Sequence, residues 1–167
     1  VGLMAKWGHC DYQQLQKLRD NLAKLQSIDL DKFCRDVSKE LAARLLALVI
    51  PRTPVGRYPR SSGKKGGTLR RGWTAKTQAE AAGGSRVDAQ AYANALPVRK
   101  SGNTYDIQVI NPVEYASYVE FGHRTPRGNG WVEGQYFLTL SERDLERLAP
   151  GVIERKLEAL LREAFRV

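Results

Sequence analysis

A run of basic side chains without an acid among them is the feature of this sequence best suited to do chemistry. Lys and Arg number 27 in the 167-residue chain and Asp and Glu number 18, which gives a net charge of +9 at neutral pH. Eight of the cations lie in residues 51–76, the basic segment: Arg52, Arg57, Arg60, Lys64, Lys65, Arg70, Arg71 and Lys76. Outside this segment 19 cations stand against 18 acids, so the excess charge is local. Lysine and arginine bind phosphates and carboxylates, which points to a polyanion or an acidic protein surface as the partner.

Three interpretations of the basic segment are compatible with the sequence alone. The first is a solvated loop whose charge keeps the protein soluble. The second is contact of residues 52–76 with nucleic acid, in which the cations neutralise phosphates while Tyr58 and Trp73 add stacking. Such binding would not depend on base sequence, because the chain has neither a recognition-helix nor a ribonucleoprotein signature. The third is a loop that becomes ordered against another protein subunit, with its arginines paired to acids of the neighbour.

The sequence offers little for catalysis. Its two histidines, His9 and His123, have no nearby nucleophile motif such as G-x-S-x-G. Glu114 and Glu120 are six residues apart on one short predicted helix, which separates them by about 240° at ~100° per residue, so they cannot form a carboxylate pair. A helix cap and a solvated or paired acid are the simpler roles for them. We therefore predict that the protein is not an enzyme; a hydrolase or nuclease would need acids that converge in a cleft.

No cofactor, metal or small-molecule substrate is predicted. His9, Cys10, Cys34 and His123 have the residue types of a zinc site but not its spacing, and Cys34 falls on the apolar stripe of a helix, where a buried thiol is usual. Residues 63–68 superficially suggest a phosphate-binding loop. They are not preceded by an apolar strand, and no helix is predicted after them, so the structural context of such a loop is missing.

Length and composition fit an ordinary globular protein. We expect residues 1–167 to form a single domain, since this length is enough for one hydrophobic core. The chain contains neither a run of about 18 apolar residues nor the apolar region of a signal peptide, so we expect neither membrane contact nor secretion. Two cysteines cannot form a disulfide scaffold and are expected as thiols in a reducing cytoplasm.

Two helices that precede a polar loop are predicted for the first part of the chain. The first runs from about residue 11 to 26, with Asp11 and Gln14 at capping-box spacing and one narrow leucine seam: Leu15, Leu18, Leu22 and Leu25. The second begins at Asp29 or Asp31 and ends near Ile50, because Pro51 stops it. Residues 51–68, the basic loop, are rich in Pro and Gly and carry no apolar periodicity, so we expect them to be mobile.

The central part of the chain predicts a small antiparallel sheet. Leu69, Arg71, Trp73 and Ala75 alternate as in a strand, and residues 78–95 are weakly helical around an AGGS break. Residues 96–101 and 104–110 flank Gly102-Asn103 as a hairpin. Its register places Val98 opposite Ile107 and Leu96 opposite Val109 on the core side, and Arg99 opposite Asp106 on the other side.

Helices are predicted again toward the end of the chain. Asn111 and Pro112 indicate the start of a short helix that ends near Gly122, and residues 123–130 form a second polar loop. Residues 137–148 are predicted as a helix, and Pro150 starts a final one. The predicted fold class is α+β: two N-terminal helices, a three- to four-stranded antiparallel sheet with a hairpin, and C-terminal helices packed on it.

Two short motifs resemble a known family. Residues 115–122 read YASYVEFG and resemble the YA-x-YVEFG signature of the "gene product ten" family of tailed lambda-like phages and prophages, usually described as tail components at the neck or tail-completion position. Residues 67–72, GTLRRG, are similar to that family's TG-x-L-R-x-S segment, which follows a Thr-Pro or Ala-Pro pair, here Thr53-Pro54. The insert between Pro54 and Thr68 is longer than is usual in the family, and His123 stands where Thr is common.

The resemblance implies a structural virion protein of a phage or prophage. It implies a neck, head-tail connector or tail-completion subunit that joins a ring around the DNA channel, without catalysis or a cofactor. Its partners would be copies of itself and neighbouring connector or tail proteins, and it would be assembled in the host cytoplasm and located in the virion. The family motif supplies a second group of candidate residues beside the cations: Tyr115, Tyr118, Glu120, Phe121 and Gly122. We expect its aromatic side chains to pack on the sheet, with a subunit contact as the alternative.

Overall fold

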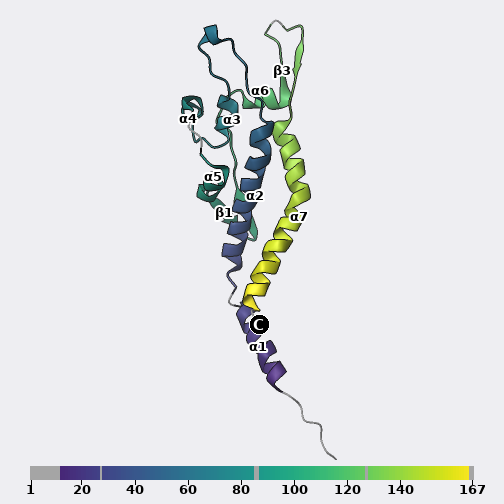
Figure 1. Ribbon diagram of the computed structural model, residues 1–167. Helices are drawn as coiled ribbons and strands as arrows, with labels where there is room; N and C mark the ends of the chain where they lie inside the picture. Colours follow the sequence, from purple (N-terminus) through teal and green to yellow (C-terminus); the bar gives the residue numbers. More distant parts are fainter. Residues whose placement is uncertain (1–11, 27, 85–86, 127, 166–167) are drawn as a thin grey trace, which may run out of the picture.

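Two long helices side by side form the body of the molecule. The computed structural model describes residues 12–26, 28–84, 87–126 and 128–165. Helix α2 (Leu30–Arg52) packs along α7 (Phe137–Ala164), and the two run in opposite directions (Figure 1). Helix α1 (Tyr12–Gln26) extends beyond the end where α2 begins and contacts α7. The predicted α+β class is confirmed, and so are the first two helices, except that Pro51 does not stop α2, which continues to Arg52.

The smaller elements cover one side and one end of this pair. Helices α3 (Thr68–Gly72), α4 (Gln78–Gly83) and α5 (Ala89–Ala95) and strands β1 (Val98–Ser101) and β2 (Thr104–Ile107) lie beside α2. Helix α6 (Ala116–Phe121) and strands β3 (Gly122–Arg124) and β4 (Trp131–Glu133) lie at the end where α2 stops and α7 starts (Figure 1). The core is therefore built from α2, from the first residue of α7 and from the short elements and the loops beside them: Ala42, Ala43, Leu46, Val49, Leu69, Trp73, Ala75, Ala81, Ala93, Val113 and Phe137.

The hairpin β1–β2 has the predicted register. Val98 lies opposite Ile107, Arg99 opposite Asp106 and Ser101 opposite Thr104. Leu96 and Val109 lie beyond the paired residues. The agreement follows from two independent constraints, since the turn fixes which residues face each other and the apolar pair fixes which face is covered.

The predicted strand at residues 69–75 is wrong. Residues 68–72 form helix α3, which starts after Gly67 in the left-handed conformation (φ 91°) and brings Leu69, Gly72 and Trp73 to one buried side. Leu69 and Trp73 are four residues apart, and such a pair shares one face of a helical turn as well as one face of a strand. The predicted three- to four-stranded sheet is thus reduced to two separate two-stranded sheets, β1–β2 and β3–β4.

Three predictions for the second half of the chain also need correction. Residues 123–130, expected as a polar loop, carry part of hairpin β3–β4, in which His123 lies opposite Val132. The helix expected from Asn111 begins only at Ala116. The Asn111 side chain donates to the Leu69 carbonyl and accepts from the Val113 N–H, and so ties the segment before α6 to α3. Helix α7 continues through Pro150 without a break. The burial of Ser141 and Val152, on either side of the proline, supports one uninterrupted helix that packs on α2.

Side-chain hydrogen bonds stabilise the first turn of helix α2. The Asp29 side chain accepts a hydrogen bond of 2.9 Å from the Lys32 N–H and caps the helix, as predicted. The predicted capping box at Asp11 and Gln14 involves Asp11, which lies outside the described residues.

At Asp31 the carboxylate accepts from Arg35 Nε (2.6 Å), Lys100 Nζ (2.8 Å) and the Tyr105 hydroxyl (2.8 Å), which ties α2 to hairpin β1–β2. Lys100, Arg35 and Tyr105 together hold the pKa of Asp31 well below its ordinary value.

We expect Asp31→Asn to lower the melting temperature by a few degrees at pH 7 and to leave the protein less sensitive to acid. A depressed pKa contributes stability that is present above the unfolded Asp value of about 3.9 and is lost as the pH falls toward the folded value. The difference between wild type and variant should therefore be constant near neutral pH and shrink below about pH 4. Thermal unfolding followed by circular dichroism at pH 7 and pH 3 measures it. Asp36→Asn is the control, because Asp36 has only an exposed pair with Lys32 in the described structure; equal acid sensitivity of wild type and Asp31→Asn would contradict the prediction.

Candidate interaction surface

Two projections leave the same end of the helix pair. The basic loop rises from the end of α2, and hairpin β3–β4 rises from α6 and returns to the start of α7 (Figure 1). We call this region, formed by residues 53–67, α6, β3 and β4, the loop end. It brings together the basic segment and the YASYVEFG motif, which are about 50 residues apart in the sequence.

Four of the predicted basic residues point to solvent. Arg57, Arg60, Lys64 and Lys65 are exposed, and within the described part of the chain none of them has an ion pair. The regular structure described in this stretch is one 3₁₀ turn, Arg60–Ser62, closed by Gly63 in the left-handed conformation (φ 61°). The Lys64 ammonium lies 5.9 Å from the centre of the exposed Tyr58 ring. These four cations are therefore available to an anionic partner.

Of the other four cations in the basic segment, Lys76 is exposed after α3 and three are used inside the fold. Arg52 forms an ion pair with Asp144 and donates to the Ser141 hydroxyl (3.3 Å), so it joins α2 to α7. Arg70 donates to the Thr53 carbonyl from Nε (3.0 Å) and Nη2 (2.7 Å). Arg71 donates to the carbonyls of Ala81 (2.8 Å) and Gly66 (3.2 Å). Arg52, with Arg147, also lowers the pKa of Asp144.

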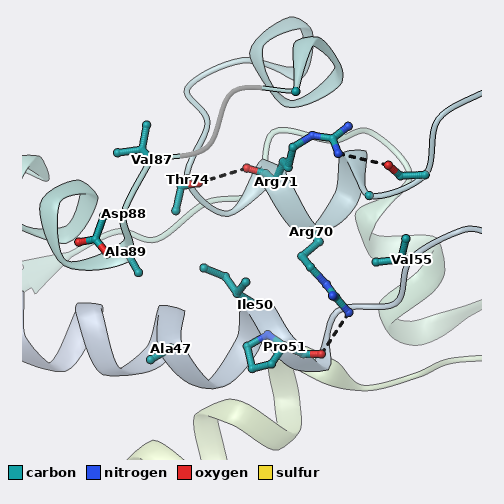
Figure 2. Close-up of a pocket in the computed structure, with 13 residues that line it drawn as sticks. Ala47, Ile50, Pro51, Val55, Arg70, Arg71, Thr74, Val87, Asp88 and Ala89 are labelled. Carbon is teal, nitrogen blue, oxygen red and sulfur yellow. Dashed lines mark hydrogen bonds between the residues drawn. The ribbon is translucent and has the colours of Figure 1, made fainter.

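A cavity of about 670 Å³ lies at the foot of the basic loop. Figure 2 shows that it is enclosed by the end of α2, by α3 and by the residues that lead into α5. Arg70 reaches across it to the Pro51 carbonyl (3.2 Å), and Thr74 bonds to the Arg71 carbonyl. Asp88 caps α5 by accepting from the Ala91 N–H. Each of these polar side chains already has a partner within the chain, so they hold the basic loop against the helices. They do not point together into the cavity as groups free to bind a ligand.

We expect Arg70→Met to release the basic loop without unfolding the body. The substitution removes the guanidinium contacts to Thr53 and Pro51, and hydrogen bonds from a charged donor contribute about 1.5–3 kcal/mol. A loss of about 2 kcal/mol in the local closing energy corresponds to roughly 30-fold faster cleavage of the loop by trypsin. Arg99→Met, on exposed strand β1, is the control. Unchanged cleavage at residues 57–65 in Arg70→Met would show that the loop is held by other contacts.

Two residues of the family motif have structural roles. Glu120 is 3% exposed and accepts three hydrogen bonds at the start of α7: from Leu138 N (2.9 Å), Thr139 N (2.9 Å) and Thr139 Oγ1 (2.7 Å). Gly122 has φ 85°, and a Cβ there would overlap the Val132 carbonyl oxygen. The glycine therefore allows α6 to end and β3 to start beside β4. Glu120, expected as a solvated or paired acid, is instead buried and caps the start of α7.

The aromatic residues of the motif are on the surface. Tyr118 is 58% and Phe121 57% exposed, so the expectation that they pack on a sheet is wrong for both. Helix α6 has six residues and turns Ala116 and Val119 toward the core, which leaves these rings outside. Tyr115 is also exposed, and its pKa is raised by partial burial and by the nearby Tyr58 of the basic loop.

Sequence analysis missed further exposed apolar residues next to this motif. They come from β4, where successive side chains point to opposite faces of the hairpin, and from the residues around the start of α7. With the motif aromatics we call these exposed side chains the aromatic surface, which covers more than one face of this end of the molecule: Tyr115, Tyr118, Phe121, Trp131, Val132, Tyr136 and Leu140. Monomers rarely gather so many large apolar side chains without a partner to cover them. The signal available in the sequence was the aromatic and β-branched pair Trp131 and Val132 after Gly130, since such residues favour strands.

The other sequence candidates are not brought together as a site. His9 and Cys10 lie outside the described residues, Cys34 is half-buried on α2, and His123 lies on β3, 5.9 Å from the Tyr118 ring. Across the described ranges, no three His, Cys, Asp or Glu side chains are arranged to hold a metal ion. No helix in the same ranges is long and apolar enough to span a membrane.

Comparison with models of protein families gives a match. The model of one family, described as "Bacteriophage HK97-gp10, putative tail-component", matches residues 16–122, nearly two thirds of the chain. The matched range runs from α1 to Gly122 and includes the basic loop and the YASYVEFG motif. Comparisons with curated proteins and with solved structures find no match.

Proposed function

Because the chain belongs to the HK97-gp10-like family of phage tail components, we propose that it is a neck, head-tail connector or tail-completion subunit that joins a ring of copies around the DNA channel. Membership makes it a structural protein of a phage virion whose partners are other tail proteins. The ring, the neck position and assembly in the host cytoplasm, from a phage or a prophage, are parts of the proposal. We propose no catalytic role.

The observation that carries the proposal is the aromatic surface. Its side chains include a tyrosine, a phenylalanine and a tryptophan that are each more than half exposed, and aromatic residues are enriched where protein partners meet. The hairpin β3–β4 and the buried Glu120 hold this surface at the loop end. A subunit that joins a larger assembly needs such a surface, whereas a protein that works alone would leave it exposed to aggregation.

Imaging of assemblies tests the proposed ring. The full chain is mixed with the connector and tail proteins encoded beside it and analysed by native mass spectrometry and negative-stain microscopy. We expect closed rings, formed either alone or on the neighbouring protein as a template. A matched pair of variants tests the aromatic surface as the contact to the neighbouring tail protein: Phe121→Ser should prevent entry into the joint assembly, and Leu148→Ser, a similarly exposed position on the middle of α7, should not. A chain that stays monomeric with every neighbour and never enters particles overturns the proposal.

A second candidate function is sequence-independent binding of nucleic acid by residues 52–76. The four exposed cations Arg57, Arg60, Lys64 and Lys65 favour it, together with the exposed ring of Tyr58. Of the eight cations in the basic segment, Arg52, Arg70 and Arg71 are less suited to this contact because their guanidinium groups are already bonded within the chain, and Lys76 lies outside the basic loop, after α3. In a ring, such a loop near the channel would meet DNA phosphates without selecting a base sequence.

We expect replacement of those four cations by Gln to abolish retention on duplex DNA at low salt. If all four meet phosphates, the slope of log affinity against log salt becomes shallower by about 3 to 4, because each neutralised phosphate accounts for roughly 0.9 of that slope. Fluorescence anisotropy with labelled duplexes of two unrelated sequences measures the slope and the sequence independence. The control variant removes four cations elsewhere: Lys17, Lys39, Arg99 and Arg143. Equal losses for the two variants would assign the effect to net charge and would discard the loop as the binding segment.

A further inference from the structure

Most of the leucine seam predicted for α1 is uncovered in the isolated chain; only Leu25, at the end of the helix that contacts α7, is half-buried. Leu15, Leu18 and Leu22 are 52–56% exposed, although their spacing is that of a packed helix face. Helix α1 extends past the end of the α2–α7 pair instead of lying along it (Figure 1). A 15-residue helix is of marginal stability in water without a packed face, so this seam requires a cover.

An apolar groove that fits such a helix lies toward the other end of the molecule. It has a volume of about 530 Å³ and runs between α2, α7 and the extended segment 107–110. Four of the residues that line it are leucines: Leu41 and Leu45 from α2, and Leu138 and Leu145 from α7. On α7 these leucines are seven residues apart, about 10 Å along the helix axis. The seam from Leu15 to Leu22 has the same length and the same seven-residue repeat.

The charges at the two surfaces also match. Glu142 is the charged side chain that lines the groove in the described structure. On a helical wheel of α1 the charged residue beside the seam is Arg19, while Lys17, Asp20 and Lys24 lie toward the opposite side. Arg19 is solvent-exposed, and its exposed pair with Asp20 costs little to exchange for another acid. An arginine beside the seam and an acid in the groove favour one docking partner, this chain itself.

The positions of seam and groove favour a second copy over the same chain. Helix α1 leaves the pair at the start of α2, whereas Leu138 and Leu145 lie in the first turns of α7, toward the loop end (Figure 1). The seam of one molecule is thus carried away from its own groove. A contact between different patches on successive copies is heterologous, and repetition of it closes into a ring when the rotation allows.

We propose that the α1 leucine seam of one copy docks into the α2–α7 groove of the next copy. The proposal rests on the proposed ring function and names one contact that would build the ring. It is distinct from the aromatic surface, which then stays available to neighbouring tail proteins. Each subunit donates one helix and receives one, so every copy in a closed ring has its seam covered.

Disulfide trapping between two marked variants tests the contact. Both carry Cys10→Ser and Cys34→Ser; one adds Leu22→Cys on the seam and the other Leu45→Cys on the groove. On mild oxidation of the full-length chains we expect a disulfide between unlike chains, identified by isotopic labelling of one variant. Linkage of Leu22→Cys chains to each other would indicate seam-to-seam pairing. A chain with both cysteines that closes on itself at high dilution would indicate docking within one molecule. Either result overturns the proposal, and so does the absence of any linkage.

Charge reversal provides a second measurement that does not depend on the leucines. Arg19→Glu alone and Glu142→Arg alone should each weaken self-association in sedimentation experiments by about two- to five-fold, and the double variant should restore it. Both side chains are on the surface, and unchanged circular dichroism shows that the fold is kept. If the double variant is as weak as the sum of the single ones, Arg19 and Glu142 do not meet and the proposed docking is wrong.

Failure of this inference can be told apart from failure of the proposed function. Rings or particles that contain the protein but never yield the disulfide between unlike chains would leave the tail role in place and remove the α1 contact. A disulfide between unlike chains in a protein that never joins tail proteins would establish the contact and remove the proposed role.

Discussion

Replacement of Trp73 by alanine is expected to lower the free energy of unfolding by about 4 kcal/mol, the largest effect of any single substitution considered. Trp73 is 3% exposed, and its ring meets Phe137 of α7 edge-on at 6.2 Å between centroids. Truncation of a buried tryptophan costs about 3–5 kcal/mol, because apolar burial is removed and a cavity remains. Urea unfolding followed by circular dichroism measures the decrease.

The hydrogen bonds of Trp73 explain why this position joins the basic loop to the body. Its Nε1 donates to Thr53 Oγ1 (2.7 Å), and that hydroxyl in turn donates to the Val49 carbonyl (2.7 Å). Trp73→Phe keeps most of the ring but loses the first bond, so we expect about 1–2 kcal/mol. Trp131→Ala, at an exposed position on β4, should change stability by less than about 0.5 kcal/mol. A decrease below about 1 kcal/mol in Trp73→Ala would show that Trp73 is not the anchor of the loop.

The parts of the fold that were predictable are those fixed by a repeated local pattern. The α1 and α2 helices follow from leucine spacing and from Asp29, and hairpin β1–β2 follows from a turn and an apolar pair that agree on one register. The segment 69–75 lacked such a second constraint. Leu69 and Trp73 share one face in a strand and also in a helical turn, so the local sequence does not decide between the two structures. In the fold this segment is helical, and its Leu69 carbonyl accepts a hydrogen bond from Asn111, 42 residues away.

The sequence predicts which residue types the candidate site contains, but not which of them bond within the fold and which stay exposed to a partner. Nothing in the sequence distinguishes the eight arginines and lysines of the basic segment, yet three of them bond within the fold and the other five are exposed. Arg70 and Arg71 bond within the fold because the backbone carbonyls of Thr53 and Ala81 lie beside α3 and accept from them. Such acceptors arise from tertiary structure and leave no pattern in the local sequence. The exposure of Tyr118 and Phe121 was missed for a related reason, since the sheet expected to cover them is not formed.

Glu120 connects the family motif to the longest helix of the described structure. Helix α7 begins after Tyr136, which is in the left-handed conformation (φ 50°) and provides no side-chain cap. The first N–H groups of a helix have no partner within it, and Glu120 supplies acceptors for two of them from α6. The chain that leads into α7 is held by the same helix, because Gln135 N and Tyr136 N donate to the carbonyls of Val119 and Glu120. The end of α6 thus fixes both where α7 starts and in which direction it runs.

We therefore expect Glu120→Ala to lower the free energy of unfolding by about 3 kcal/mol. The substitution leaves two N–H groups and the Thr139 hydroxyl without their acceptor in a buried place, and each such group costs about 1–3 kcal/mol, in part recovered by water. Glu120→Gln keeps one acceptor oxygen but removes the charge that favours a helix N-terminus, so its cost should be about half as large. Glu114→Ala, an exposed acid just before α6, is the matched control and should cost less than about 0.5 kcal/mol. Urea unfolding gives the energies, and hydrogen exchange at Leu138 and Thr139 locates the effect; protection that decreases equally along all of α7 would contradict a cap at its first turn.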